Sequence, residues 1–261
     1  MYDGKRVATA AVSGIDARLA LASDDGFPSI SKTERVAVFA PRRDMSLLEL
    51  PKAQSDLITR IFPDFSHFER ASWTCLEHPK DRYGAALVCL PRSKSLSYGL
   101  IAQACSVTDG PVLVDGAKTD GVEAVLKACK TRAQIDAVYS KAHGKLFVLH
   151  PPFSFGDWTN DKPSQNQNEF LTTPGVFSAD GVDPASKLLG DILPGRLGGV
   201  VADLGAGWGY LAHRALENDA VEAVHLIEAD NAALDCARFN IQDPRAAFHW
   251  QDAMRWSSKS P

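Results

Sequence analysis

The stretch VVADLGAGWGYLA, from Val200 to Ala212, decides the fold of this chain of 261 residues. An apolar run leads into Gly205, Gly207 and Gly209, and a segment with helical spacing follows. Glycine lets the backbone pass close to a ligand, and the first turn of a helix offers unpaired N–H groups to negative charge. The stretch therefore predicts a strand, a ligand-binding turn and a helix.

The spacing of the glycines indicates which kind of ligand the turn binds. A dinucleotide fingerprint has the pattern G-x-G-x-x-G, but here Tyr210 occupies the position of the third glycine. Asp203 lies two residues before the first glycine, where its carboxylate would repel a pyrophosphate and would suit a ligand that carries an amino group. The pattern thus disfavours a nicotinamide dinucleotide.

Two further carboxylates follow at the ends of the next predicted strands. Glu228 lies 23 residues after Gly205, where a carboxylate can accept hydrogen bonds from both ribose hydroxyls. Asp252, in the segment WQDAM, is placed to accept from an adenine amino group while a neighbouring backbone N–H reaches a ring nitrogen. Either residue alone would be an ordinary exposed strand end. Together with Asp203 they predict a site for S-adenosylmethionine.

At these motifs the sequence resembles the class I S-adenosylmethionine-dependent methyltransferases. The segment TTPGVFSADGVDPASKLL, residues 172–189, is similar to the entry segment of the small-subunit ribosomal RNA guanine-N2 methyltransferases of the C type. Proteins of that family pair two methyltransferase-like domains, of which the second is catalytic. The resemblance implies that the cofactor is bound by Asp203, Gly205, Ala206 and Gly207 at its methionine end, by Glu228 at the ribose, by Asp252 and Ala253 at the adenine, and by Phe177 and Ser178 at the border of the pocket. For Phe177, packing in the core is the alternative.

Apolar runs typical of strands alternate with segments of helical spacing along the whole chain, which predicts an α/β fold with mostly parallel sheets. The expected strands are 34–41, 83–91, 110–116, 144–153, 198–205, 220–230 and 246–253, and the expected helices are 46–62, 97–107, 120–129, 209–218 and 231–242. We therefore expect two tandem Rossmann-like methyltransferase domains. By resemblance the first, 17–155, is degenerate and binds no cofactor. A polar linker, 156–175, leads to the second, 176–261, which is incomplete and has its first three strands only.

The segment HPPF, from His150 to Phe153, is similar to the Asn-Pro-Pro-Phe turn that amino-methyltransferases use to hold a flipped base. Its first residue is His instead of Asn, and it closes the first predicted domain. We interpret it as a rigid strand exit. No Asn-Pro-Pro-Phe turn follows Asp252, so the chain is expected to be truncated and no catalytic residue is assigned to it.

Composition bounds the remaining properties. Hydrophobic residues make up 45% of the chain and charged residues 23%, and no apolar run approaches the length of a membrane span or has the form of a signal peptide. The five cysteines form no C-x-x-C pair, which favours reduced thiols, a cytoplasmic location and no metal. The net charge of −4 argues against wholesale binding to nucleic acid, although six basic residues against three acidic ones lie between Lys118 and Lys145.

The predicted function is transfer of a methyl group from S-adenosylmethionine to the exocyclic amine of a guanine in ribosomal RNA. The expected partner is ribosomal RNA or the small ribosomal subunit, without a membrane, and the protein is expected to be a monomer. The first alternative is a non-catalytic RNA-binding or assembly remnant of such an enzyme. The second is a nicotinamide-dependent oxidoreductase, which Tyr210 and Asp203 disfavour.

Overall fold

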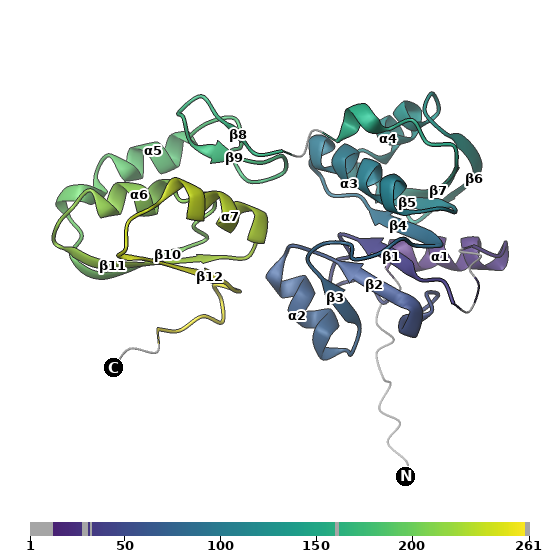
Figure 1. The fold of residues 1–261 in the computed structure, drawn as a ribbon, viewed down its shortest axis with the longest axis horizontal. Helices are drawn as coiled ribbons and strands as arrows, with labels where there is room; N and C mark the ends of the chain where they lie inside the picture. The colour runs from purple at the N-terminus through teal and green to yellow at the C-terminus, as the bar shows by residue number, and fades with distance from the viewer. Residues whose placement is uncertain (1–12, 28–30, 32, 160–161, 259–261) are drawn as a thin grey trace, which may run out of the picture.

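The computed structural model describes residues 13–27, 31, 33–159 and 162–258. Figure 1 shows two α/β bodies side by side, each built on its own sheet. The absence of a signal peptide, which was expected from the first residues, concerns a segment outside this range.

The first sheet has the strand order β3-β2-β1-β4-β5-β7-β6, and its strands are parallel except for β7, which runs antiparallel to both of its neighbours. Its strands are β1 Val36–Phe39, β2 Ser55–Ile58, β3 Thr74–Leu76, β4 Ala85–Cys89, β5 Val112–Ala117, β6 Gln134–Lys141 and β7 Gly144–His150. Helices α1 Gly14–Asp24 and α2 Phe62–Arg70 pack on one face, and α3 Lys94–Val107 and α4 Val122–Cys129 pack on the other. Because both faces are covered, the central strands are buried along their whole length.

The predicted helix over 46–62 is wrong. This stretch forms the short 3-10 turn η1, Lys52–Gln54, and then the strand β2 between β1 and β3. Pairing on both sides overrides the local helical spacing. The polar Asp56 is accommodated within the buried strand because its carboxylate accepts hydrogen bonds from Arg35 Nε at 3.0 Å and from the Tyr83 hydroxyl at 3.2 Å.

The second sheet has the order β10-β11-β12, and all three strands are parallel. They span Gly199–Leu204, Val221–Glu228 and Ala246–Trp250, which confirms the three strands expected after residue 197. The helices of this part are α5 Pro184–Gly190, α6 Tyr210–Leu216 and α7 Asn231–Asn240. Helices α6 and α7 cover one face of the sheet, on its upper side in Figure 1. The strand, turn and helix expected around the glycines are thus confirmed.

The segment between the two sheets packs against both bodies. On the first side, the 3-10 turn η3 Gly156–Trp158 places the Trp158 ring on Tyr98, with centroids 3.9 Å apart. On the second side, strands β8 Ser164–Gln165 and β9 Leu171–Thr172 form a hairpin, and Phe170 packs on Trp208. Two further 3-10 turns are η2 Lys118–Asp120 and η4 Leu193–Gly195.

A short stretch of the first body hydrogen-bonds to the loop that follows β11. The Phe62 N–H donates to the Ala229 carbonyl at 2.8 Å, and the Asn231 N–H donates to the Arg60 carbonyl at 2.9 Å. The Trp250 indole N–H reaches both of these carbonyls. An ion pair between Arg60 Nη2 and Asp230 Oδ2, 3.0 Å apart and largely buried, completes the junction. The two bodies are therefore joined at the carboxyl end of the second sheet.

The Arg18–Asp115 ion pair offers a test of the first body. Both side chains are almost fully buried, and Arg18 donates from Nε and Nη2 to the two carboxylate oxygens and from Nη1 to the Lys141 carbonyl. Burial raises the pKa of Asp115, and the Arg18 guanidinium opposes that shift. Asp115→Ala leaves a buried guanidinium unpaired, so we expect the free energy of unfolding to fall by about 3–5 kcal/mol in a urea titration.

Asp109→Ala is the matched control, because the Arg82–Asp109 pair is exposed to solvent. It should leave the urea midpoint unchanged within error. Equal midpoints for the two variants would show that the buried pair contributes nothing to stability.

The junction offers a second test, through a double-mutant cycle on Arg60 and Asp230. Asp230 also caps α7 through the Ala232 N–H at 3.1 Å, and the cycle separates this contribution from the ion pair. We expect a coupling energy of about 1–3 kcal/mol in thermal unfolding. The same cycle on Arg238 and Asp235, an exposed pair within α7, should give no coupling. Equal couplings in both cycles would mean that the junction is no stronger than a surface pair.

Candidate functional site

Three carboxylates lie at the carboxyl edge of the second sheet. Because β10, β11 and β12 are parallel and adjacent, their carboxyl ends meet at this edge. Asp203 pairs with Leu226, two residues before Glu228, so the side chains of both carboxylates project to the face that α6 and α7 cover. Asp252 follows β12 by two residues. The structure thus brings the three predicted positions to one edge.

The glycine turn connects β10 to α6 in a conformation that favours glycine. Gly205, Gly207 and Gly209 have φ values of +82°, +56° and +94°. A Cβ on either of the first two would meet open space, whereas one on Gly209 would lie 2.9 Å from Ile241 Cδ1. The first two glycines therefore leave the backbone accessible to a ligand, and the third allows α6 and α7 to pack closely.

Backbone hydrogen bonds tie this turn to β11. The N–H groups of Gly205 and Ala206 both donate to the Ile227 carbonyl, at 2.8 and 3.1 Å. Glu228 Oε2 accepts from the Gly207 N–H at 2.7 Å, and its Oε1 accepts from the Asp230 N–H at 2.8 Å. Each carboxylate oxygen can accept a second hydrogen bond. Glu228 therefore holds the turn in place and retains acceptor capacity for a ligand.

The surroundings of Asp203 shift the pKa of its carboxyl group. Burial raises its pKa to about 6, with a smaller contribution from the nearby charge of Glu228, and a hydrogen bond from the Ala212 backbone opposes the shift. Its Oδ2 atom is buried and has no hydrogen-bond partner among the described residues. Buried polar atoms are almost always satisfied, so this oxygen is an acceptor whose capacity the described residues leave unused.

Asp252 and Ala253 occupy the turn that follows β12. The Gln251 N–H donates to the Glu228 carbonyl at 3.0 Å, which keeps this turn beside β11. Asp252 is half-buried, and its Oδ1 accepts from the Met254 N–H at 3.0 Å. The carboxylate thus stabilises its own turn and stands at the same edge as the other two.

The entry segment reaches the glycine turn through a tryptophan. The Trp208 indole N–H donates to the Phe177 carbonyl at 3.0 Å, and Trp208 itself is buried. The Phe177 side chain is 72% exposed, so the alternative that it packs in the core is wrong. Ser178 follows it with a φ of +50°. The segment therefore borders the turn through its backbone.

Sequence reasoning missed three residues that shape this site. Asn240 hydrogen-bonds to the backbone of Leu171 and to the Trp208 carbonyl, and so joins β9 to the glycine turn. Asp230 and Arg60 hold the loop after Glu228. The signal that could have identified Asp230 as a helix cap is an acidic residue directly before a helical run. No sequence signal connected it to Arg60, which lies far away along the chain.

The HPPF segment lies away from the carboxyl edge of its sheet. His150 ends β7, and because β7 is antiparallel to β5, this end lies beside the amino end of β5. Its Nε2 atom is 3.4 Å from Asp136 Oδ2. The segment is therefore a strand exit, as predicted.

Among the described residues, no group of three or more His, Cys, Asp or Glu side chains could hold a metal ion. No helix in the same part of the chain is long and apolar enough to cross a membrane. The five cysteines are free thiols, and burial raises the pKa of Cys75 and Cys236 to about 11.

Comparisons with known proteins find similarity to methyltransferases. The family model described as the methyltransferase small domain matches residues 167–260. Curated relatives include ribosomal RNA small subunit methyltransferase C of Acinetobacter baumannii, 25% identical over 77% of this chain and 64% of the relative. The Pseudomonas aeruginosa protein of that name is 26% identical over 76% and 63%, and the Idiomarina loihiensis protein is 30% identical over 41% and 35%.

The fold matches that of a solved structure, the 16S rRNA N2 methyltransferase RsmC of T. Thermophilus in complex with AdoMet and guanosine, with a TM-score of 0.69. The identity is 19%, and the match covers 90% of this chain and 68% of that one. The chain spans less than two thirds of the curated relatives named above. By sequence this chain is thus a distant relative of ribosomal RNA small subunit methyltransferase C, with a methyltransferase small domain matched over residues 167–260, and its fold is α/β and Rossmann-like.

Proposed function

We propose that this chain carries the cofactor-binding part of an S-adenosylmethionine-dependent methyltransferase that acts on the exocyclic amine of a guanine in ribosomal RNA. The observation that carries the proposal is the buried, unpartnered Asp203 oxygen beside a glycine turn, at the same sheet edge as Glu228. The names of the relatives supply the substrate class.

The residues present fit this cofactor. Asp203 would accept from the ammonium group, and the backbone of Gly205, Ala206 and Gly207 would lie along the methionine end. Glu228 would accept from the ribose hydroxyls with the lone pairs that Gly207 and Asp230 leave unused.

At the adenine end, Asp252 would accept from the amino group, and the Ala253 N–H would reach a ring nitrogen. Phe177 and Ser178 would border the same pocket. When bound, S-adenosylmethionine supplies a methyl group on a sulfonium centre. The chain's own contribution is to orient the cofactor, and we assign no catalytic residue to it.

The proposed boundaries are a first domain over 17–155, a linking segment over 156–175 and a second domain over 176–261. Two observations support degeneracy of the first domain. Ala40, Pro41 and Arg42 follow β1, where the second sheet has its glycine turn, and Arg60 follows β2, where the second sheet has the carboxylate of Glu228.

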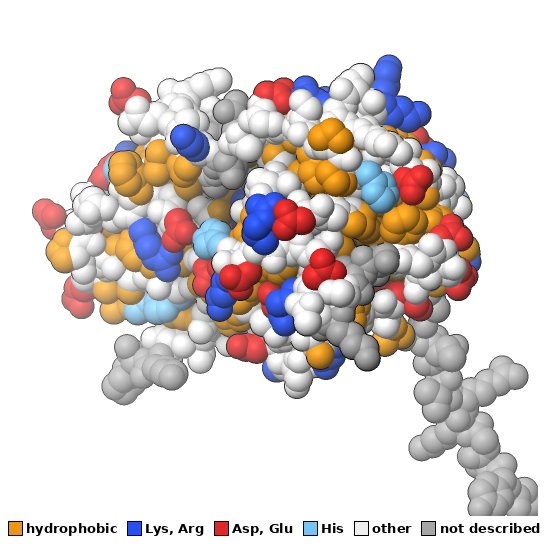
Figure 2. All heavy atoms as spheres, turned by 45° about the vertical axis from the view of Figure 1, so that its right-hand side comes forward, with side chains coloured by type: hydrophobic (Ala, Val, Ile, Leu, Met, Phe, Trp, Pro, Cys, Tyr) orange, Lys and Arg blue, Asp and Glu red, His pale blue; other side chains and the backbone are white. Residues whose placement is uncertain are grey.

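Contact with RNA through the first domain is part of the same proposal. Lys118, Lys127, Lys130 and Lys141 are exposed and make no ion pair within the described residues. Lys145 pairs with Glu123, and Figure 2 shows basic and acidic side chains interspersed over the face that it draws. Phosphate contacts from such a surface would be few and sensitive to salt.

Two rivals differ from the proposal in measurable ways. A dinucleotide would bring its negatively charged pyrophosphate against the carboxylate of Asp203. Burial already disfavours the charge on this carboxylate, and the pyrophosphate would repel it further. A non-catalytic remnant would retain the fold and lose the cofactor. Calorimetric titration with S-adenosylhomocysteine and with a nicotinamide dinucleotide separates all three, because the proposal requires the first to bind and the second not to bind.

Replacing Glu228 tests the position of the ribose. Glu228→Ala removes two acceptor oxygens and loosens the Gly207 turn, so we expect the affinity for S-adenosylhomocysteine to fall by about 100-fold or more. Melting of the first domain should not change. Glu222→Ala, at the exposed opposite end of β11, should bind normally. Retained affinity in Glu228→Ala would place the ribose elsewhere.

The raised pKa of Asp203 predicts a pH dependence. The ionised carboxylate pairs with the ligand ammonium, so affinity for S-adenosylhomocysteine should fall about tenfold from about pH 7 to pH 5. The stability of the ligand-free protein depends on pH in the opposite direction. Because the pKa of Asp203 is raised in the folded state, its protonation stabilises the fold below the ordinary aspartate pKa of 3.8, and this contribution is lost as the pH rises through about 6.

Asp203→Asn is the matched control for this prediction. It should bind more weakly at neutral pH and show no dependence over the same window. An unchanged pH profile in that variant would exclude Asp203 as the titrating group.

A further inference from the structure

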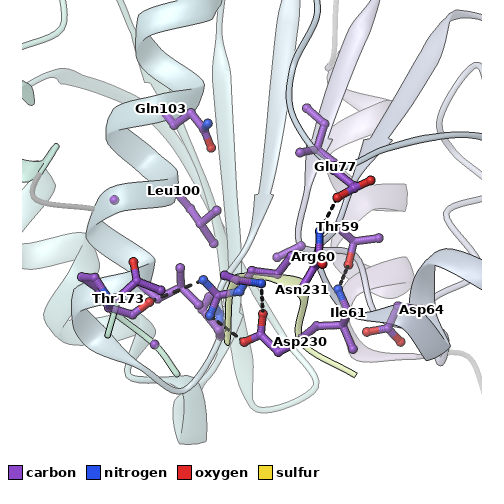
Figure 3. Close-up of a pocket in the computed structure, with 18 of the residues that line it drawn as sticks. Thr59, Arg60, Ile61, Asp64, Glu77, Leu100, Gln103, Thr173, Asp230 and Asn231 are labelled. Atoms are coloured by element: carbon purple, nitrogen blue, oxygen red, sulfur yellow. Dashed lines mark hydrogen bonds and ion pairs between the residues drawn. The ribbon is translucent and has the colours of Figure 1, made fainter. Parts of the chain in front are cut away.

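A cavity lies between the two bodies, apart from the glycine turn. Its volume is about 450 Å³, and Figure 3 draws it with the residues that line it. On one side Pro41 follows β1, Thr59 follows β2 and Pro91 follows β4. On the other side the wall is formed by residues 173–175 and by the start of α7. The cavity therefore sits on the carboxyl edge of the first sheet.

The cavity lies at the position where open α/β sheets commonly bind ligands. From β1 the chain continues to β2 and β3 on one side, and β4 and β5 lie on the other, so the strand order reverses between β1 and β4. Ligands bind in the crevice at the carboxyl ends of the strands at such a switch point. The first sheet thus retains a cavity at its ligand position, although it lacks a glycine turn.

The charges around this cavity disfavour a phosphate. Two arginines and four carboxylates line it: Arg42, Arg60, Asp64, Glu77, Asp230 and Asp235. Arg60 already pairs with Asp230, and Arg42 lies near Asp44 and Asp120. The excess of negative charge and the two engaged guanidinium groups favour a neutral or cationic ligand.

The walls combine apolar surface with hydrogen-bonding groups whose capacity is not used. In Figure 3, Leu100 and Gln103 of α3 form one wall, and Glu77 and Thr59 face them from the other. No hydrogen bond of the Gln103 carboxamide is present in the described part of the chain, so it can both donate and accept. A glutamine amide matches the donor and acceptor edge of a purine.

Two carboxylates provide acceptors for sugar hydroxyls. Glu77 Oε2 accepts from the Asn231 side chain, and Asp64 Oδ1 accepts from the Arg43 N–H at 2.9 Å. The second oxygen of each carboxylate is left for a ligand. Carboxylates at the ends of such strands are typical partners of ribose hydroxyls.

We propose that this cavity binds an unphosphorylated purine nucleoside, with the base against Leu100 and Gln103 and the ribose toward Glu77 and Asp64. The site is built from the first body and α7, and it does not require that the glycine turn bind a cofactor. Its volume lies within the range of small-molecule pockets, which are mostly apolar with a few convergent polar groups.

The test is a nuclear magnetic resonance titration of the full chain with adenosine and with guanosine. We expect saturable shifts of the Gln103 side-chain amide and the Leu100 methyl groups with at least one of them. Adenosine 5′-monophosphate should bind about tenfold more weakly or not at all. No shift up to millimolar nucleoside, or equal binding of the monophosphate, would overturn the proposal.

Variants separate this site from the glycine turn. Leu100→Trp fills the cavity and should abolish the shifts, whereas Leu188→Trp on the exposed surface of α5 should not. If Leu100→Trp does not fold, Gln103→Leu should weaken binding about tenfold by removing the amide. If the folded Leu100→Trp variant, or Gln103→Leu in its place, still binds the nucleoside with unchanged affinity, the proposed position of the base is wrong.

Asp203→Asn distinguishes this proposal from the proposed function, because Asp203 does not line the cavity. It should weaken the binding of S-adenosylhomocysteine and keep the nucleoside shifts at Gln103. If the nucleoside instead shifts only Gly205 and Gly207, the nucleoside occupies the glycine turn and the cavity proposal is wrong.

Discussion

The carboxylate of Glu228 accepts from the backbone N–H groups of Gly207 and Asp230, and the candidate site depends on this pair of hydrogen bonds. One bond holds the glycine turn, and the other holds the loop after β11. Asp230 in turn pairs with Arg60 of the first body. A continuous chain of contacts thus connects the first sheet to the glycine turn. Through these contacts the first body can stabilise the candidate site from outside the glycine turn.

The second sheet is covered by helices on one face only in the described residues. Val200 and Leu204 of β10 are each 59% exposed on the other face. Nearby on that face, His225 and His249 form a ring-nitrogen hydrogen bond of 2.9 Å, and the Trp256 ring lies beside both. The geometry of the candidate site therefore rests on α6, α7 and the junction with the first body, which all contact the sheet from its edge or its covered face.

Local sequence patterns predicted the second sheet well and the first sheet only in part. The glycine turn and the strand that ends at Glu228 depend on residues close in sequence, and both are present. The strand β2 was predicted as helix because pairing with two neighbours decides its structure, and the edge strands β3 and β6 were not predicted. Pairing between strands is a long-range interaction that periodicity over 46–62 does not report.

By itself the sequence determined that three strand ends carry Asp203, Glu228 and Asp252, and that the first of them precedes a turn only glycines adopt easily. The physical reason is local, because backbone conformation and strand polarity follow from neighbouring residues. Only the tertiary structure decided that Asp203 has an unsatisfied buried oxygen, that Phe177 is exposed, and that Arg60 closes the junction beside a cavity. Burial and long-range pairing arise when segments distant in sequence pack together, and no local pattern contains that information.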